Sequence, residues 1–255
     1  MIPKIIHYCW FGGNPLPKLA QKCIESWKKY CPDYEIKEWN ESNFDLNYND
    51  YVREAYEAKK WAFITDVVRL KVMVDEGGIY MDTDVEVLKS LDELLEYNAV
   101  SGFENDTQFP TGLMACEKGN PMFKEFLEDY EGAHFILEDG SFDLTTNVVR
   151  MMRIGTKYGI KFNNIKQNIN GFTILPKDFL CPKDPETKRI NLTTNTLTIH
   201  HFDGSWVEWY DRAAGKRGPK LQRLLGYTIG QKVNVCIYVI QKYGLLGCIR
   251  KIFKK

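Results

Sequence analysis

The sequence has no long apolar run, no cysteine-pair motif and no low-complexity tract. No stretch of about 18 consecutive apolar residues occurs, which excludes a conventional membrane-spanning helix. The N-terminus lacks the long apolar segment of a secretory signal. The seven cysteines are odd in number and none lies in a CxxC pair, so neither a zinc site nor a disulfide framework is predicted. These absences together predict a cytoplasmic protein with reduced thiols.

Acidic residues are missing from the end of the chain. Eleven Lys and Arg residues follow Asp211 and no Asp or Glu does, whereas the formal charge of the whole chain is zero. An acidic body therefore precedes a basic tail, which predicts an anionic partner for the tail. Apolar residues are interspersed with the basic ones over 220–255, as in an amphipathic helix lying on anionic lipid. The alternative is a C-terminal helix packed on the domain with a solvated basic face. The tail has no nucleic-acid-binding motif, and no nucleic acid is expected as a partner.

What is present is an alternation of strand-like and helix-like stretches, and it predicts an α/β sandwich with a mixed, largely parallel central sheet. The chain length fits one domain, expected over 1–215, followed by a basic, partly amphipathic helical tail over 216–255. The expected strands are 4–10, 34–39, 79–81, 85–88, 99–103, 112–116, 172–175 and 196–200. The expected helices are 19–30, 51–60, 61–76, 121–131 and 145–158.

Two aspartates, in the run Asp82-Thr83-Asp84, directly follow the short apolar strand 79–81. This order places both carboxylates at the carboxyl edge of the sheet, where open α/β sheets bind ligands. No basic residue is adjacent in sequence, so two like charges there are costly unless a cation neutralises them. Carboxylate oxygens favour Mg²⁺ or Mn²⁺, and such a cation bridges to a diphosphate. A bare DxD pattern is weak by itself, and an aspartate pair in a turn or at a helix N-terminus is the alternative.

A second polar pair precedes this motif on the expected helix 61–76. Asp66 and Arg69 lie three residues apart and therefore project from one face of that helix. Apolar residues surround them at buried spacing, which favours a positioned pair facing a ligand over a surface ion pair. The carboxylate suits sugar hydroxyls, and the guanidinium suits sugar oxygens or phosphate. Gly77-Gly78 ends the helix and leads the chain directly to the DxD strand.

These segments resemble a known family. The runs Trp61-Ala-Phe-Ile-Thr-Asp-Val-Val-Arg-Leu and Asp75-Glu-Gly-Gly-Ile-Tyr-Met-Asp-Thr-Asp-Val resemble the DXD sugar-binding region of family 32 glycosyltransferases. That group includes yeast-type initiating α-1,6-mannosyltransferases, α-1,4-galactosyltransferases and bacterial capsular polysaccharide enzymes. The resemblance extends to the start of the chain and to His200-His-Phe-Asp-Gly-Ser-Trp, so it covers about residues 1–210. The chain is also similar to the catalytic domain of the clostridial glucosylating toxins.

The resemblance implies a GT-A fold of Rossmann type and a metal-dependent glycosyltransferase that retains the anomeric configuration. The implied cofactor is Mn²⁺ or Mg²⁺, and the implied donor is a nucleotide-sugar. Asp66, Arg69, Asp82 and Asp84 are implied as catalytic residues. Asp84 would ligate the metal directly, and Asp82 would contact ribose and reach the metal through water.

The remaining site residues also follow from the resemblance. Trp10 would stack on the donor base, and Tyr80 would lie near the transferred sugar. Ser205 and Trp206 would come from a C-terminal loop that closes over the diphosphate. His201 and Ser205 complete the expected metal set, with His200 as the alternative to His201. Asn147 would be a sugar or acceptor contact, although the segment around it departs from the pattern of many family members.

The expected reaction moves a hexose, with UDP-galactose or UDP-glucose favoured as donor, to a glycan acceptor carried on a lipid diphosphate. Such an enzyme would act in cell-surface or capsular polysaccharide synthesis, as a peripheral protein on the inner face of the plasma membrane. Two alternatives remain: a toxin-like protein glycosyltransferase and an inactive sugar-nucleotide-binding protein. A haloacid-dehalogenase-like phosphatase is rejected, because Glu86 occupies the position where that family has Thr or Val.

Overall fold

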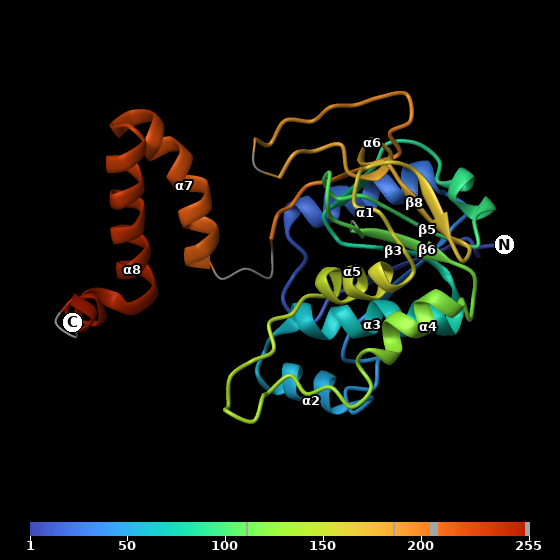
Figure 1. The fold of residues 1–255 in the computed structure, drawn as a ribbon, viewed down its shortest axis with the longest axis horizontal. Coiled ribbons are helices and arrows are strands. Elements are labelled where there is room, and N and C mark those ends of the chain that lie inside the picture. Colours follow the sequence, from blue (N-terminus) through green and yellow to red (C-terminus); the bar gives the residue numbers. More distant parts are fainter. Residues whose placement is uncertain (111, 186, 205–208, 253–255) are drawn as a thin grey trace. The chain divides into compact units, whose positions relative to one another are not determined.

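A computed structural model describes residues 1–110, 112–185, 187–204 and 209–252 of the chain (Figure 1). The chain forms two compact units, Met1–Phe202 and Asp203–Lys255. Helix α7 (Trp209–Leu225) runs continuously through residue 215. The structure therefore divides the chain earlier than the boundary we expected at residue 215.

The first unit is built on a seven-stranded sheet with the order β2-β1-β3-β6-β5-β8-β7. Strand β1 pairs in parallel with β2 and β3, and β5 pairs in parallel with β8, whereas β6 and β7 run in the opposite direction. The predicted α/β sandwich on a mixed and mostly parallel sheet is confirmed. The strands are β1 (Ile5–Cys9), β2 (Glu35–Trp39), β3 (Gly78–Met81), β5 (Ala99–Gly102), β6 (Leu113–Cys116), β7 (Gln167–Ile169) and β8 (Phe172–Leu175).

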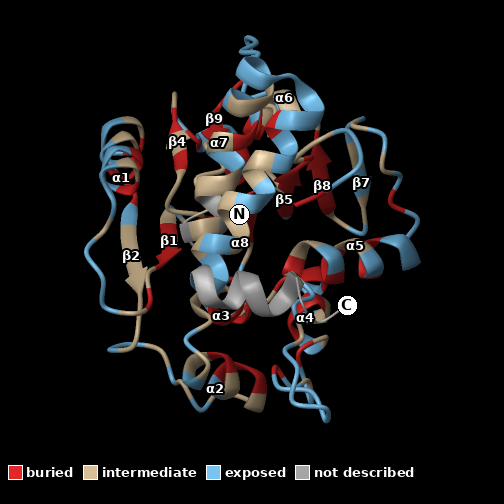
Figure 2. Cartoon of the chain, turned by 90° about the vertical axis from the view of Figure 1, so that its left-hand side faces the viewer, coloured by how far each residue is buried: buried red, intermediate tan, exposed pale blue. Residues whose placement is uncertain are grey.

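Helices cover both faces of this sheet and bury its central strands, whereas the edge strands β2 and β7 are only partly covered (Figure 2). Side chains alternate along β3, so that Tyr80 joins one apolar core while Ile79 and Met81 join the other. The face of Tyr80 is covered by α2 (Asp50–Glu57), α3 (Trp61–Glu76), α4 (Pro121–Glu128) and α5 (Asn147–Lys157). The opposite face is covered by α1 (Lys18–Tyr30), the 3₁₀ helix η1 (Asp92–Glu96) and α6 (Lys177–Leu180).

A glycine corner connects α3 to β3. Gly77 and Gly78 both have positive φ angles, of 72° and 106°, which only glycine adopts at little cost. A Cβ atom on Gly77 would lie 2.5 Å from the backbone nitrogen of Lys118, so the corner also has no room for a side chain. The ring Nε2 of buried His7 lies 2.8 Å from the carbonyl oxygen of Gly77. The corner is thus fixed to β1, and it sets the point at which β3 begins.

A second, two-stranded sheet joins distant parts of the first unit. Strand β4 (Val85–Val87) pairs antiparallel with β9 (Thr198–His200), and Val85 lies opposite His200 in the register. The sequence predicted both extended segments but not their pairing. This pairing brings His200 next to the residues that directly precede β4.

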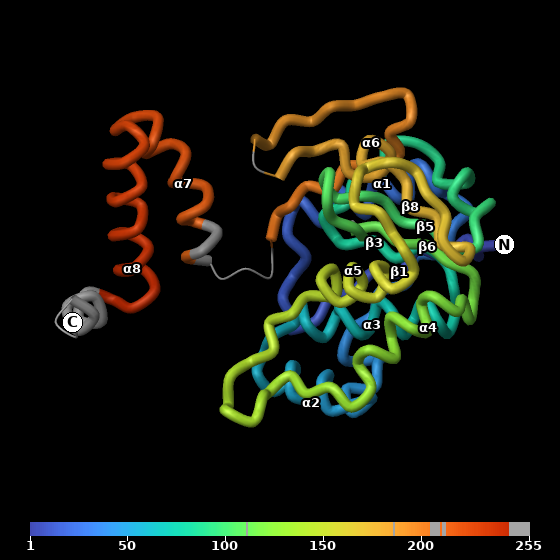
Figure 3. The backbone as a smooth tube through the Cα atoms, in the orientation of Figure 1, coloured from blue at the N-terminus to red at the C-terminus, as the bar shows by residue number. Residues whose placement is uncertain are grey.

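The second unit is a helical hairpin, so the predicted helical tail is confirmed (Figure 3). Helix α7 is joined to α8 (Tyr227–Ile252) at Gly226, and α8 is bent at Gly244. Arg217 of α7 donates hydrogen bonds to Asn234 and Gln241 of α8 at 2.9 and 3.2 Å, which helps to hold the two helices together. Among the helices formed by the described residues, none combines the length and the apolar composition needed to cross a bilayer.

Candidate active site and metal centre

The DxD motif lies where β3 ends. The backbone N–H of Asp82 donates to the carbonyl oxygen of Gly112 at 2.8 Å, and that of Val85 donates to the carbonyl oxygen of Asp82 at 3.0 Å. The motif is therefore a hydrogen-bonded turn between β3 and β4. Because β1 and β3 are adjacent parallel strands, Trp10, which directly follows β1, comes from the same edge of the sheet. Its indole N–H is bonded to the carbonyl oxygen of Asn14 at 2.5 Å.

Asp82, Asp84 and His200 form a group that fits a metal ion. One potential ligand atom from each residue lies within 4.8 Å of the other two. A Cβ atom on Gly112 would lie 3.0 Å from the Oδ2 of Asp82 and 3.2 Å from the Cε1 of His200, so a side chain there would crowd both groups. Two carboxylates with one imidazole form a set compatible with Mn²⁺ or Mg²⁺. The residues present therefore fit the cation expected from the sequence.

The histidine in this group is His200 and not His201, which we expected among the metal ligands. His200 places its Nε2 3.3 Å from the Oδ1 of Asp84. The Nε2 of His201 instead lies 2.8 Å from the Oε2 of Glu86, which also forms an ion pair with Lys22. Adjacent residues of an extended chain project in opposite directions, so only one of two neighbouring histidines can face the aspartates.

Arg69 bridges the two polar pairs that the sequence singled out. Its Nη1 lies 3.2 Å from the Oδ1 of Asp82, and its guanidinium lies 4.6 Å from the centre of the Tyr80 ring. The Tyr80 hydroxyl donates to the same oxygen of Asp82 at 3.1 Å. The premise that only a bound cation would neutralise the acidic pair is therefore wrong. Arg69 already contributes positive charge next to Asp82, because the fold brings it there from α3.

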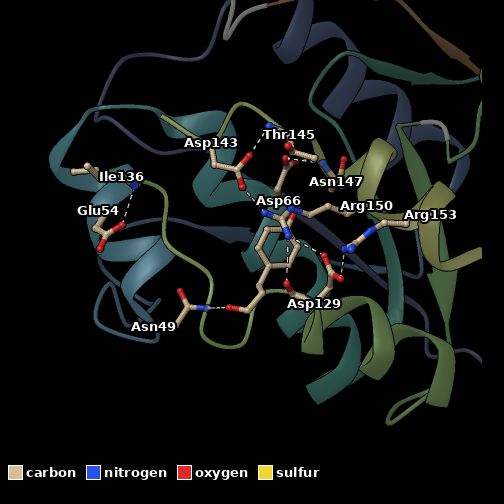
Figure 4. A network of polar contacts seen from close by, with 11 residues as sticks. Asn49, Glu54, Asp66, Asp129, Ile136, Asp143, Thr145, Asn147, Arg150 and Arg153 are labelled. Atoms are coloured by element: carbon tan, nitrogen blue, oxygen red, sulfur yellow. Dashed lines mark hydrogen bonds and ion pairs between the residues drawn. The ribbon is translucent and has the colours of Figure 1, made fainter. Parts of the chain in front are cut away.

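Asp66 lies behind Arg69 and is buried. Its Oδ1 is 3.4 Å from an Arg69 nitrogen, and its Oδ2 accepts a hydrogen bond from the backbone N–H of Asn147 at 3.1 Å (Figure 4). Burial raises the pKa of Asp66 to about 6, although the charge of Arg69 opposes the shift. Asn147 begins α5, and the preceding Thr146 forms no side-chain cap, so Asp66 caps this helix from another helix. The structure thus brings Asn147 next to Asp66.

Two acid–base groups beside the DxD motif have shifted pKa values. Burial by itself lowers the pKa of His200, but the Asp84 carboxylate and the Cys181 thiol raise it, so that it lies well above its ordinary value. Burial raises the pKa of Glu104, which follows β5. Glu104 lies in none of the motifs that the sequence analysis singled out. Its position after a strand parallel to β3 is the signal that could have identified it.

The structure does not place every predicted residue. Ser205 and Trp206, the expected diphosphate contacts, lie outside the described residues. The described residues thus bring Asp66, Arg69, Tyr80, Asp82, Asp84 and Asn147 into one connected region that extends from the DxD motif to α5.

Residues 17–101 match a family described as a glycosyltransferase sugar-binding region containing a DXD motif. Over 136 residues the chain is 32% identical to inositol phosphoceramide mannosyltransferase 3 of Schizosaccharomyces pombe. This match covers 50% of this chain and 37% of that protein. Over 87 residues it is 34% identical to Toxin Afp18 of Yersinia ruckeri, covering 31% and 4% of the two chains. The solved structure of the PaToxG glycosyltransferase is similar with a TM-score of 0.44 at 20% identity, covering 62% of this chain and 72% of that one.

The chain therefore carries the sugar-binding region of DXD glycosyltransferases, and the resemblance predicted from the sequence is confirmed. The matched family segment contains Asp66, Arg69, Asp82 and Asp84. The chain spans less than two fifths of the length of the curated relatives described above.

Proposed function

We propose that the protein is a metal-dependent, retaining glycosyltransferase that moves a hexose from a nucleotide-sugar to a glycan acceptor. UDP-galactose or UDP-glucose is the favoured donor. One observation supports this function above the others: a metal-compatible group of Asp82, Asp84 and His200 adjoins the buried pair of Arg69 and Asp66 within a DXD sugar-binding region.

Each described residue has a role in this proposal. Asp84 and His200 would hold Mn²⁺ or Mg²⁺, with Asp82 reaching the metal through water. The bound cation supplies neutralising charge for the donor diphosphate. Arg69, which is fixed over Tyr80, presents its guanidinium to sugar or phosphate oxygens, and Asp66 accepts hydrogen bonds from sugar hydroxyls. Trp10 offers its indole face to the base, and Asn147 lies beside the sugar. Ser205 and Trp206 remain proposed diphosphate contacts.

The proposed reaction replaces one bond at the anomeric carbon. The bond to the leaving phosphate oxygen breaks while the acceptor hydroxyl oxygen forms its bond on the same face. The acceptor proton passes to the leaving phosphate, so the configuration is retained. Positive charge fixed around the DxD turn before the reaction stabilises the developing phosphate charge.

Asp84→Ala tests the proposal directly. We expect the variant to lose at least about 100-fold of the Mn²⁺-dependent release of UDP from a UDP-hexose, because it removes a metal ligand. The measurement is a donor screen with Mn²⁺ that follows released nucleotide. Asp33→Ala, which removes a carboxylate whose side chain is 59% exposed and pairs with Lys4, is the matched control and should retain full activity.

Two outcomes would decide against the enzyme. If no donor released nucleotide in the presence of any divalent cation, the enzymatic function would be wrong. Tight binding of the same nucleotide-sugar without turnover would favour the inactive sugar-nucleotide-binding protein instead.

We propose further that the acceptor is a glycan on a lipid diphosphate, used in capsular or other cell-surface polysaccharide synthesis. The support is the second unit, which combines basic residues with exposed apolar ones. Leu224, Leu225, Tyr227 and Ile229 are all exposed at the tip of the hairpin. A basic, apolar tip suits the anionic inner face of the plasma membrane, where a lipid-linked acceptor would lie.

A toxin-like protein glycosyltransferase is the second candidate. The similarity of 87 residues to Toxin Afp18, at 34% identity, favours it. Transfer of labelled sugar to a protein fraction, with none to a lipid-extractable glycan, would select this alternative.

A further inference from the structure

The proposed metal site uses only one of the two ring nitrogens of His200, and the other nitrogen has no assigned role. Its Nε2 faces Asp84, but its Nδ1 is buried and has no hydrogen-bond partner. The nearest carboxylate oxygen recorded for this atom is the Oε2 of Glu104, 4.0 Å away. The Cys181 thiol also lies close to the ring, but a thiol is a weak hydrogen-bonding group. A buried ring nitrogen without a hydrogen-bond partner is uncommon in proteins, and Glu104 offers the carboxylate that could supply one.

The fold holds Glu104 in this position. It follows β5, and its backbone N–H donates to the carbonyl oxygen of Gln108 at 2.8 Å. Its side chain is largely buried, and among the described residues its ion-pair contact is with His200. The negative charges of Asp82 and Asp84 also act on it. A carboxylate is therefore kept beside two others, with an imidazole between it and Asp84.

Packing restricts the other ways in which the His200 ring could be oriented. The Phe202 ring lies against it with a centroid separation of 4.3 Å. Gly112 lies so close that a Cβ there would be 3.2 Å from the ring carbon Cε1. These apolar contacts fix the plane of the ring but provide no hydrogen bond to Nδ1.

We propose that Glu104 is a positioning residue that orients His200 for binding a divalent cation together with Asp82 and Asp84. The assignment rests on the metal-dependent function proposed above. A metal-binding histidine is neutral, with one nitrogen on the metal and the other N–H donated to a carboxylate or carbonyl. That hydrogen bond selects the tautomer, holds the ring and makes the ligand nitrogen more basic. A small movement would close the 4.0 Å gap between Glu104 and His200.

Direct Mn²⁺ binding to the full chain tests the assignment. Free Mn²⁺ is measured by electron paramagnetic resonance at fixed pH for the wild type, Glu104→Ala, Glu104→Gln and Asp106→Ala. We expect Glu104→Ala to raise the dissociation constant about 10- to 100-fold, the usual effect of losing such a partner. Glu104→Gln should fall between the two, because its amide oxygen still accepts from Nδ1 but carries no charge. Asp106, whose side chain is 71% exposed and pairs with Lys177, lies on the same loop, and its variant should bind like the wild type.

The other results would overturn the assignment. If Glu104→Ala and Glu104→Gln bound Mn²⁺ within twofold of the wild type, Glu104 would have no positioning role. Equal weakening in Asp106→Ala would indicate a general charge effect instead. Absence of Mn²⁺ binding to the wild type would overturn the metal-dependent function as well. Because Glu104→Gln preserves the size of the side chain, it separates these outcomes from a failure of Glu104→Ala to fold.

Discussion

At the scale of single residues, His7 shows how a buried side chain supports the site from a distance. The indole N–H of Trp39 donates to the Nδ1 of His7 at 3.1 Å, so the proton of the neutral ring lies on Nε2 and is donated to Gly77. If Nδ1 were protonated, its N–H would face the indole N–H of Trp39, and two donors would lie opposite each other. Burial accordingly lowers the pKa of His7 below its ordinary value of 6.5. The glycine corner before the DxD strand thus depends on an uncharged histidine.

This arrangement predicts how stability changes with pH. A group whose pKa is lowered on folding binds fewer protons in the folded state, so its contribution is full above pH 6.5 and is lost as the pH falls. We expect the wild type to be more stable than His7→Gln at pH 7.5 and the difference to narrow by pH 5.5. The raised pKa of Asp66 acts in the opposite sense, but it is common to both chains. The measurement is urea unfolding at each pH, and a difference independent of pH would contradict the prediction.

At the scale of elements, α5 is held by charges at its buried side. The Arg150 guanidinium pairs with Asp129 at 2.8 Å and with Asp143 at 2.5 Å, and it lies over the Tyr130 ring (Figure 4). Asp143 belongs to the segment between α4 and α5, so Arg150 ties this segment to the helix. The first turn of the same helix donates to Asp66. The position of α5 is therefore linked to the sugar side of the proposed site.

Two arginines on α5 give a matched comparison. Arg150→Met should lower the free energy of unfolding by about 3–5 kcal/mol, because it removes the arginine that pairs with both shielded carboxylates, Asp129 and Asp143. Arg153→Ala removes a partner of the same Asp129 from a side chain that is 60% exposed, and should cost about 0–1 kcal/mol. Urea unfolding of both variants measures the difference. Similar losses would show that the buried pair has no special role.

The sequence predicted the helices and strands well, but it predicted poorly which of them contact one another. Helix α3 has the predicted bounds, Trp61–Glu76, because its apolar spacing and the two following glycines define it locally. Strand β7 was missed, since Gln167-Asn168-Ile169 is short and polar. His200 and Glu104 were not identified as a pair, because their proximity depends on the β4–β9 register and on the loop after β5. Local patterns predict elements, whereas these contacts come from long-range packing.

At the scale of the whole molecule, charge is divided between the two units. Nine of the eleven basic residues after Asp211 lie in α7 and α8, and the first unit carries the excess of acidic residues. Leu224, Tyr227 and Ile229 are exposed by 78%, 69% and 60% at the hairpin tip, with Arg223 in the adjacent turn of α7. Apolar side chains next to basic ones allow both insertion and attraction at an anionic surface.

Vesicle flotation tests this surface. We expect the full chain to float with vesicles that contain anionic lipid and to be released by 0.5 M salt, about the strength that screens charges within a few ångströms. The double variant Leu224→Ser, Ile229→Ser should bind about tenfold or more weakly, because it loses buried apolar area. Thr228→Ser, a change at an exposed position between them, is the control. Equal binding to neutral and anionic vesicles would contradict the charge contribution, and unchanged binding of the double variant would contradict the tip.

The antiparallel pairing of β4 with β9 also has a consequence for how the protein acquires its site. Val85 and its partner His200 are far apart in the sequence, so the loop that their contact closes includes much of the first unit. During synthesis the two aspartates leave the ribosome long before the histidine. The complete ligand set therefore exists only after the last strand of the first unit has docked. If the proposed cation binds there, its affinity reports the completion of folding, and a nascent or truncated chain that ends before β9 would contain the DxD turn without its imidazole.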